Sequence, residues 1–412
     1  MSKTIIIIGA GLAGLSAALQ AAENGCNVKL VSSLPSERAQ SVMAEGGINA
    51  ALNTKDENDS PEEHFTDTIK AACGLADPNA VWGMTQAAPE LVHWLLKLGV
   101  KFNMSGYDDV DLRNFGGQKK KRTAFAQSDT GKQIMTAMID AVRRKEASGM
   151  VERFSHHSFL TLRLCGNICC GCVIRDEYSQ ETVELPGDAV IVATGGMHGL
   201  FGNTTGSLSN TGEVTAELFR LGVPLANGEM IQYHPTTVKC GGKRMLISEA
   251  ARGEGGRLFA MKDGKQWYFM EEKYPELGNL MPRDITAREI WKVSHESEVF
   301  LDMTEISEEI ISNKLSGLAD DCMTYLHKDI RKEPVSVLPG IHYFMGGILV
   351  DEQHRTPIQN LYAAGECCAQ YHGANRLGGN SLLGALYGGR VAAKSACEQA
   401  DVVDLSCATQ ID

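Results

Sequence analysis

Apolar runs near both ends of the chain predict the strands of a parallel sheet. Thr4–Ile8 is a continuous β-branched run, which is typical of a strand buried on both faces. A helix is expected from there through about Glu23, and Val28–Val31 predicts the next strand, so this segment is a βαβ unit. Two more buried strands are expected at Val190–Ala193 and Leu361–Ala364. The pattern therefore indicates an α/β fold to which both ends of the chain contribute.

Between the two ends the pattern changes, and the change predicts a second domain. From about residue 224 to residue 335, mixed strands and turns alternate with charged helices such as Glu305–Leu318. An insertion of about 110 residues is an ordinary domain size. We therefore expect a cofactor domain of residues 1–223 and 336–412 and an inserted α+β capping domain of residues 224–335. Outside the insertion, the periodicity predicts helices at Pro61–Cys73, Pro78–Leu98 and Lys132–Lys145 and from Ser381 onward.

Composition and charge limit the classes of partner. Apolar residues make up 43% and charged residues 22%, an ordinary globular composition, and the formal net charge is -12. The one short basic run, Lys119–Arg122, is predicted to be a solvated loop, so we expect no nucleic-acid partner. The apolar start of the chain approaches the length of a membrane span, but its regularly spaced glycines favour a different interpretation. No other stretch could span a bilayer, and we expect no direct membrane insertion.

The 12 cysteines do not form the pattern of a disulfide scaffold in a chain of this size. Cys165, Cys169, Cys170 and Cys172 cluster, but a second spaced pair for zinc and a haem-attachment histidine are both missing. Their surroundings alternate like a hairpin that turns at Gly166–Asn167. We therefore predict strand cysteines, no metal site and a reducing, cytoplasmic environment.

The first glycines form a dinucleotide-binding fingerprint. Gly9-x-Gly11-x-x-Gly14 directly follows a strand and opens a helix, which is the context that this motif requires. Gly9 would make the tight turn, Gly11 would let the backbone approach a pyrophosphate, and Gly14 would let helix and strand pack closely. The second strand ends in Ser32 rather than in the acidic residue that binds the ribose of NAD, which favours FAD.

Other small-residue segments extend the predicted cofactor site. Ala44–Gly47 suits backbone contact with a flat ring, and Leu361–Arg390 combines a strand, a glycine-rich turn and a helix start, which together offer backbone N–H groups to an anion. Taken alone, this last stretch could equally be a plain crossing loop. The predicted FAD-binding residues are Gly9, Gly11, Ala13, Gly14, Ser32, Ala44, Glu45, Gly46, Gly47, Ala193, Thr194, Gly195, Glu366, Asn380, Ser381 and Leu382.

Polar residues in and beside the predicted cap are candidates for chemistry. His234, His342, Arg283 and Arg376 could meet where the two domains face each other, the usual place for a ligand cleft. Two histidines and two arginines around one cavity would suit a small dianion, because arginine binds carboxylates through two parallel hydrogen bonds. Each residue alone could be structural, as a turn-bracing histidine or a simple ion pair. Their joint occurrence beside a flavin-type fold favours a site.

These motifs resemble one family, the flavoprotein subunits of fumarate reductase and succinate dehydrogenase, with the related soluble fumarate reductases and L-aspartate oxidases. The resemblance covers nearly the whole chain and rests on the segments GAGLAGLSAA, AEGGINAAL, RNFGG, SDTG, ATGG, QYHPTT, SEAARGEGG, PRDITARE, HYFMGGI, AAGE and HGANRLGGNSL. It implies a Rossmann-like, two-dinucleotide fold with FAD between the cofactor domain and a mobile cap. By the same resemblance, the dicarboxylate-binding residues are His234, Ser248, His342 and Arg376, the proton donor is Arg283, and the residues that reprotonate it are Glu249 and Arg252.

The resemblance also implies a reaction, the FAD-dependent reduction of fumarate to succinate, which could be reversible. Clamping both carboxylates and neutralising one makes the alkene electrophilic. A hydride then passes from flavin N5 to one alkene carbon, and Arg283 protonates the other. From the residues alone we would choose a histidine as the acid, because a guanidinium is a very weak one.

Four departures from the family pattern sharpen the expectation. Gln40 stands where membrane-bound members attach FAD through a histidine, so FAD should be non-covalent. The sequence stops at Asp412, before the long helical domain of those members, which leaves docking to an iron–sulfur subunit open. Ser248 replaces the usual threonine and keeps the hydroxyl. Phe115 stands where L-aspartate oxidases carry a glutamate, which favours a reductase.

Several alternatives remain open at this point. The chain could be an L-aspartate oxidase, a reductase of another enoate, or a module that binds FAD for electron transfer or assembly without chemistry of its own. No motif identifies the electron donor, which could be an iron–sulfur protein or another redox partner.

Overall fold

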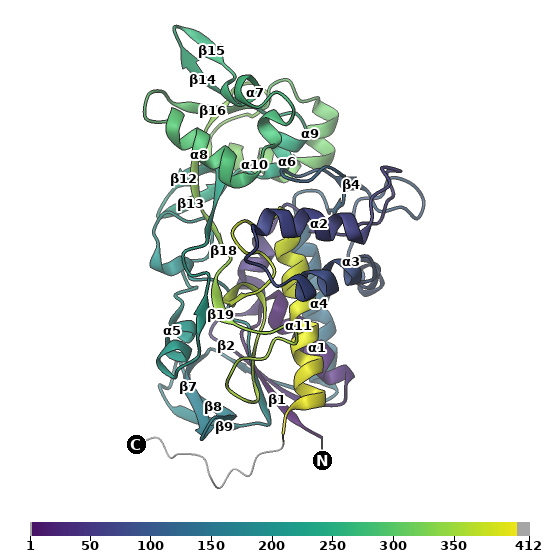
Figure 1. The fold of residues 1–412 in the computed structure, drawn as a ribbon, viewed down its shortest axis with the longest axis vertical. Helices are drawn as coiled ribbons and strands as arrows, with labels where there is room; N and C mark the ends of the chain where they lie inside the picture. The colour runs from purple at the N-terminus through teal and green to yellow at the C-terminus, as the bar shows by residue number, and fades with distance from the viewer. Residues whose placement is uncertain (1, 402–412) are drawn as a thin grey trace.

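The computed structural model describes residues 2–401 of the chain. A five-stranded sheet with the order β20-β10-β1-β2-β6 lies in the lower half of Figure 1, and its adjacent strands are parallel. The buried strands predicted from apolar runs are confirmed, and each boundary shifts by at most one residue. The four predicted strands are β1 (Thr4–Ile8), β2 (Asn27–Ser32), β10 (Ala189–Val192) and β20 (Leu361–Ala363). The fifth strand, β6 (Val151–Ser155), is not among the predictions.

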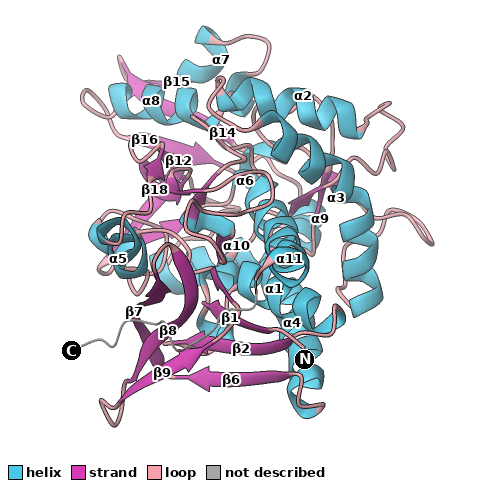
Figure 2. Ribbon diagram, turned by 60° about the horizontal axis from the view of Figure 1, so that its bottom comes forward, coloured by secondary structure: helices cyan, strands magenta, loops and turns pink. Residues whose placement is uncertain are grey.

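Two helices from opposite ends of the chain lie side by side against this sheet (Figure 1, Figure 2). They are α1 (Leu12–Glu23) and α11 (Asn380–Gln399), and Ser16 Oγ donates to the carbonyl oxygen of Leu386 at 2.6 Å. A Cβ on Gly389 would overlap the Ala13 carbonyl, so glycine permits this close approach. The predicted helices are confirmed as α2 (Pro61–Ala72), α3 (Pro78–Leu98), α4 (Thr130–Ala147) and α11.

The clustered cysteines lie in the antiparallel sheet β7 (His157–Cys165), β8 (Ile168–Asp176) and β9 (Thr182–Pro186). The predicted hairpin turn at Gly166–Asn167 is confirmed. Cys169 and Cys172 are buried, and burial raises the pKa of Cys169 to about 12. Within residues 2–401, no group of three or more His, Cys, Asp or Glu side chains is placed to hold a metal ion.

The upper part of the molecule has its own apolar core, which includes Ile247, Leu301 and Val337. Its strands β14 (Arg257–Lys262), β15 (Lys265–Trp267), β16 (Val299–Asp302) and β17 (Val335–Ser336) form an antiparallel sheet. The helices around this sheet are α6 (Glu249–Gly253), α7 (Phe269–Lys273), α8 (Arg283–Val293), α9 (Glu308–Lys314) and α10 (Ser316–Asp321).

The single helix predicted over Glu305–Leu318 is wrong. The chain breaks at Leu315, where φ is -128° and ψ is 13°, and helices α9 and α10 lie on either side. The side chain of Leu315 is buried in the upper core, and a Cβ on Gly317 would lie 2.9 Å from Ser128 Cβ. The break follows from these tertiary contacts, which helical periodicity does not report.

Another antiparallel sheet joins the two parts. It consists of β12 (Ile231–Cys240), β13 (Lys243–Leu246) and β18 (Leu338–Phe344), all antiparallel. The segment that enters the upper part is therefore hydrogen-bonded to the one that leaves it. Because β12 belongs to the predicted cap and β18 does not, this sheet crosses the predicted boundaries, which remain a prediction.

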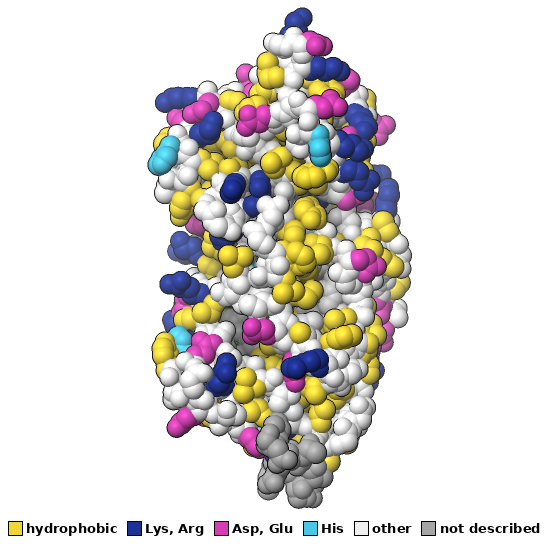
Figure 3. All heavy atoms as spheres, turned by 90° about the vertical axis from the view of Figure 1, so that its left-hand side faces the viewer, with side chains coloured by type: hydrophobic (Ala, Val, Ile, Leu, Met, Phe, Trp, Pro, Cys, Tyr) yellow, Lys and Arg dark blue, Asp and Glu magenta, His cyan; other side chains and the backbone are white. Residues whose placement is uncertain are grey.

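Charged side chains of both signs are interspersed on the face seen in Figure 3. The predicted solvated loop Lys119–Arg122 is wrong for Arg122, which is buried and pairs with Asp59 at 2.8 Å and with Asp67 at 3.0 Å.

Across residues 2–401, no helix is both long enough and apolar enough to cross a bilayer.

Candidate active site

A cavity of about 590 Å³ lies between the parallel sheet and the upper part of the molecule. Its walls come from the carboxyl ends of β1, β2 and β10, from β12, β13 and β18, and from the starts of α8 and α11. Fourteen of the predicted cofactor residues line it, and the two that do not are Gly14 and Asn380. The predicted substrate and catalytic residues also line it, with the single exception of Arg252. One cavity therefore unites the two predicted sites.

The fingerprint glycines shape one part of this cavity. Gly9 has a φ of +111°, and a Cβ there would overlap the carbonyl oxygen of Ala193 on the neighbouring strand. A Cβ on Gly14 would overlap the Gly9 carbonyl, which explains why Gly14 lies behind the cavity wall. At Gly11 a Cβ would make an ordinary contact with Ser41 Oγ at 3.7 Å, and the residue lines the cavity.

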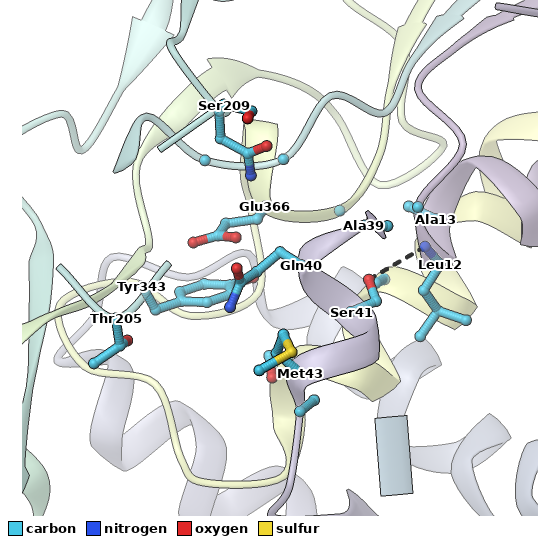
Figure 4. Close-up of a pocket in the computed structure, with 18 of the residues that line it drawn as sticks. Leu12, Ala13, Ala39, Gln40, Ser41, Met43, Thr205, Ser209, Tyr343 and Glu366 are labelled. Atoms are coloured by element: carbon cyan, nitrogen blue, oxygen red, sulfur yellow. Dashed lines mark hydrogen bonds between the residues drawn. The ribbon is translucent and has the colours of Figure 1, made fainter. Parts of the chain in front are cut away.

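The groups around these glycines fit FAD. The start of α1 faces the cavity, and the Leu12 N–H donates to Ser41 Oγ at 3.3 Å, as the dashed line in Figure 4 shows. Ser32 Oγ is buried at the end of β2 and has no hydrogen-bond partner within residues 2–401. The helix start would hold the pyrophosphate, and the unpartnered hydroxyl would bind a ribose hydroxyl.

The start of α11 is fixed by a buried amide rather than by a contact with the cavity. Asn380 accepts a hydrogen bond from Asn49 Nδ2 at 2.7 Å and donates one to Thr68 Oγ1 at 3.0 Å. Its side chain anchors the helix, whereas the next residues, Ser381 and Leu382, face the cavity.

Arg283, Glu249 and Arg252 form a buried ion-pair chain. Glu249 Oε2 accepts from Arg283 Nε at 2.8 Å and from its Nη2 at 2.6 Å, and Glu249 Oε1 lies 3.4 Å from Arg252 Nη2. Glu249 is the first residue of α6, which Ser248 caps, and Arg283 is the first residue of α8. Burial alone would raise the pKa of Glu249, but the two guanidinium groups outweigh it and hold that pKa below its usual value.

The two predicted histidines face each other, with ring centroids 5.1 Å apart. His234 Nδ1 lies 3.1 Å from the Thr236 carbonyl oxygen, and His342 Nδ1 lies 2.7 Å from Thr205 Oγ1. Burial, reinforced by the charge of Arg283, lowers the pKa of both rings well below the usual range. Both histidines are therefore neutral near pH 7 and can donate or accept hydrogen bonds without adding charge.

Arg376 is the site's unmatched cation. It is 3% exposed, its Nε has no hydrogen-bond partner, and across residues 2–401 no carboxylate lies within ion-pair distance of it. Its Cζ lies 4.4 Å from the centroid of the Tyr343 ring. Burial, together with the nearby charge of Arg283, lowers the pKa of Arg376 to about 9. A buried guanidinium of this kind favours the binding of an anion in the cavity.

Sequence reasoning missed Gln232, which connects the two arginine environments. Its Oε1 accepts from Arg283 Nη1 at 3.1 Å, and its Nε2 donates to the Arg376 carbonyl oxygen at 2.7 Å. Strand alternation was the available signal, because Gln232 lies two residues before His234 on β12 and so on the same face.

Phe115 is wedged between two glycines, since a Cβ would lie 2.8 Å from its ring at Gly46 and 2.7 Å at Gly378.

Comparison with known proteins agrees with this geometry. The family model described as FAD binding domain matches residues 4–382. A succinate dehydrogenase flavoprotein subunit from Bacillus subtilis is 44% identical, over 98% of this chain and 70% of that protein. An L-aspartate oxidase from Streptomyces coelicolor is 34% identical, over 95% of this chain and 68% of that protein.

The fold comparison points the same way. A solved structure of E. coli quinol fumarate reductase superposes with a TM-score of 0.91 and 30% identity, covering 99% of this chain and 72% of that one. The predicted α/β flavoprotein fold and the FAD cofactor are thereby confirmed. The chain belongs to the family of FAD-dependent oxidoreductases that includes the flavoprotein subunits of succinate dehydrogenase and fumarate reductase.

Proposed function

We propose that the chain interconverts fumarate and succinate and works as a fumarate reductase. The observation that carries the proposal is Arg376, a buried guanidinium that has no carboxylate partner in the described part of the chain. It shares its cavity with Arg283 and two neutral histidines. An anionic substrate would supply the missing charge. A dicarboxylate fits best, because the hydrogen-bonding groups come from several elements around the cavity.

Each predicted binding residue has a defined contribution. Arg376 would bind one substrate carboxylate, and His234, His342 and the Ser248 hydroxyl would donate hydrogen bonds without adding charge. Because Arg376, His234 and Ser248 are buried, these interactions are stronger than they would be in water. Neutralising one carboxylate of fumarate withdraws electrons from the alkene and prepares it for reduction.

The bound FAD supplies the hydride equivalents for this redox chemistry. Arg283 would donate the proton to the second alkene carbon, and Glu249 would hold its guanidinium in place through the two hydrogen bonds described above. Arg252 lies on the far side of Glu249 and outside the cavity, so it would return the proton from that side. Arginine can serve as the acid here because the carbon that it protonates resembles a carbanion and is very basic.

FAD should be held without a covalent bond, because Gln40, an amide, lines the cavity where a histidine would be needed. Figure 4 shows its side chain among the residues that line the cavity. Acid denaturation should release all of the flavin into the supernatant. Flavin that stays with the precipitated protein would contradict this.

Anaerobic turnover tests the proposed reaction. The holoprotein should oxidise reduced viologen with fumarate as acceptor, and Arg283→Ala should abolish this turnover while FAD stays bound. Arg288→Ala is the matched control, because Arg288 lies on the same helix and is exposed. If the wild-type holoprotein shows no turnover with fumarate, the proposal is wrong. The chain would then reduce a different enoate or only transfer electrons.

A second candidate is an L-aspartate oxidase, since a relative with that name is 34% identical. Phe115 argues against it, because its ring offers no carboxylate to bind the substrate amino group. Incubating the aerobic holoprotein with L-aspartate distinguishes the two, since an oxidase would release hydrogen peroxide.

The electron donor is the remaining partner. We propose a separate redox protein, such as an iron–sulfur subunit, because the relatives with succinate dehydrogenase names are themselves subunits.

A cytoplasmic location is our expectation from the cysteine usage. Fractionation of cells that produce the protein would test that location.

A further inference from the structure

A second histidine site lies beside the FAD-binding part of the cavity. His198 is 1% exposed and begins the short helical turn His198–Leu200, which follows the predicted cofactor turn after β10. Its Nε2 lies 3.1 Å from Glu366 Oε1, and its Nδ1 lies 2.8 Å from Thr204 Oγ1. Across residues 2–401, His198 is the one side chain that forms an ion-pair contact with Glu366.

The backbone is shaped to admit this pair. A Cβ on Gly196 would lie 2.8 Å from Glu366 Oε1, and a Cβ on Gly206 would overlap the His198 ring. The Phe344 ring packs edge-on against the imidazole, with centroids 5.0 Å apart. The two glycines and this aromatic contact hold the ring in one orientation, so the contact with Glu366 is a built feature.

Counting donors and acceptors assigns the protons. Glu366 Oε1 already accepts a hydrogen bond from the Phe344 N–H, and a carboxylate oxygen acts as an acceptor, so the hydrogen bond to His198 has Nε2 as its donor. The Thr204 hydroxyl lies 2.8 Å from Nδ1 and 3.2 Å from the Ile341 carbonyl oxygen, so it can donate to either one. The network is therefore satisfied whether the imidazole is neutral or cationic, and the bond to Glu366 persists in both states.

The two fixed bonds leave half of the carboxylate for a ligand. The His198 ring and the Phe344 N–H, at 3.0 Å, both reach Oε1 of Glu366. In the described part of the chain, no hydrogen bond reaches Oε2, and Glu366 lines the cavity, where Figure 4 shows its carboxylate. FAD carries several hydroxyl donors and a dianionic pyrophosphate, so an oriented and partly neutralised carboxylate suits it better than a free one.

We propose that His198 is a positioning residue of the FAD site, which fixes Glu366 so that its free oxygen accepts a hydrogen bond from the cofactor. The proposal concerns FAD binding and is independent of the substrate. Either proposal could therefore fail without affecting the other.

FAD titration of the apoprotein, followed by flavin fluorescence, tests it with two matched amides. His198→Gln places an amide nitrogen where Nε2 lies and should keep the dissociation constant within about threefold of the wild type. His198→Asn is too short to reach Glu366 and should weaken FAD binding by about tenfold to a hundredfold, the usual range for a hydrogen bond to a charged group. In a Glu366→Gln background, this difference between the two amides should shrink to less than about threefold.

The controls keep the outcome interpretable. His93→Asn, on an exposed histidine of α3, should leave the dissociation constant unchanged. Circular dichroism of each apoprotein verifies the fold before titration. Equal FAD affinity of folded His198→Asn and wild type would overturn the proposal. If His198→Asn fails to fold, a His198→Gln protein that folds but binds FAD as weakly as Glu366→Gln would overturn it as well.

Discussion

Two buried arginine environments share one cavity, and they differ in how their charge is balanced. Arg283 shares Glu249 with Arg252, and the nearest of these contacts is 2.6 Å. Arg376 lies against the face of the Tyr343 ring, and its Nη1 is 3.3 Å from the Leu377 carbonyl oxygen. Among residues 2–401, no carboxylate lies within ion-pair distance of it. The first arrangement gives each guanidinium a carboxylate contact, although the two arginines and one glutamate together keep one net positive charge. The second arrangement lacks such a contact within residues 2–401, so its positive charge is left for a ligand to balance.

The difference separates two chemical tasks. A guanidinium held by an internal carboxylate keeps its geometry with or without substrate, as a proton donor requires. A buried cation without a partner is costly, and such a group is stabilised only when an anion binds. We therefore expect changes at Glu249 to affect turnover most strongly and changes at Arg376 to affect binding most strongly.

Glu249→Gln should produce the largest effect. The neutral amide no longer balances Arg283 and Arg252, so both the orientation and the reprotonation of Arg283 suffer. We expect kcat with fumarate to fall by about a thousandfold, within the range for loss of an acid–base group. Steady-state kinetics measures it, and Glu254→Gln, which alters an ion pair with Lys314 near the end of α6, is the control. A fall in KM alone would contradict the comparison.

Arg376→Leu should have the second-largest effect. It should change KM, whereas Glu249→Gln should change kcat. KM for fumarate should rise by about a hundredfold, because a charge-assisted bidentate contact is lost. The apoprotein should also become more resistant to urea, since a buried cation without a partner has been removed. Tyr343→Phe keeps the aromatic ring beneath the guanidinium and serves as the control. If Arg376→Leu lowered kcat without raising KM, the division of tasks would be wrong.

The pH dependence of substrate binding should reveal the same unmatched charge. The pKa of Arg376 is lowered to about 9, chiefly by burial and then by Arg283, so this group loses its charge at a lower pH than other arginines do. A bound dianion favours the charged form, so affinity is complete below this pKa and falls as pH rises through it. KM should rise above pH 9 and approach about tenfold per pH unit.

Measuring KM between pH 7.5 and 10.5 tests this expectation, with Arg376→Leu as the reference. The variant should show no comparable rise, because it has no guanidinium to lose. A flat wild-type profile would show that another group supplies the charge for binding.

The features that sequence could predict are those that local patterns encode. Four of the five strands of the parallel sheet, the helices around them and the glycines at positions 9, 11 and 14 follow from periodicity and motif context, whereas β6 is not predicted. The burial of Arg122, the helix break at Leu315 and the bridging role of Gln232 depend on contacts with distant segments. The His198–Glu366 contact joins residues 168 positions apart, and no local pattern reports such a pairing.

The smallest expected effect concerns Glu45, which, like Arg376, is a buried ionisable group that lines the cavity. Its Oε2 is buried and finds no hydrogen-bond partner among the described residues. Burial together with the charge of Asp321 raises its pKa to about 8 despite the opposing charge of Arg113. In the unfolded chain this carboxyl ionises at its ordinary pKa of 4.5, so the native state loses stability as pH rises from there to about 8.

Glu45→Gln removes the titrating group and should raise the free energy of unfolding of the apoprotein by about 1–3 kcal/mol at pH 8. At pH 4 the two proteins should be equally stable, because the carboxyl is then neutral in both the folded and the unfolded states. Urea unfolding at both pH values measures the difference, and Glu90→Gln, on an exposed residue of α3, is the control. A variant less stable than the wild type at pH 8 would show that the Glu45 carboxylate, unlike the Arg376 guanidinium, has an effective partner within the fold.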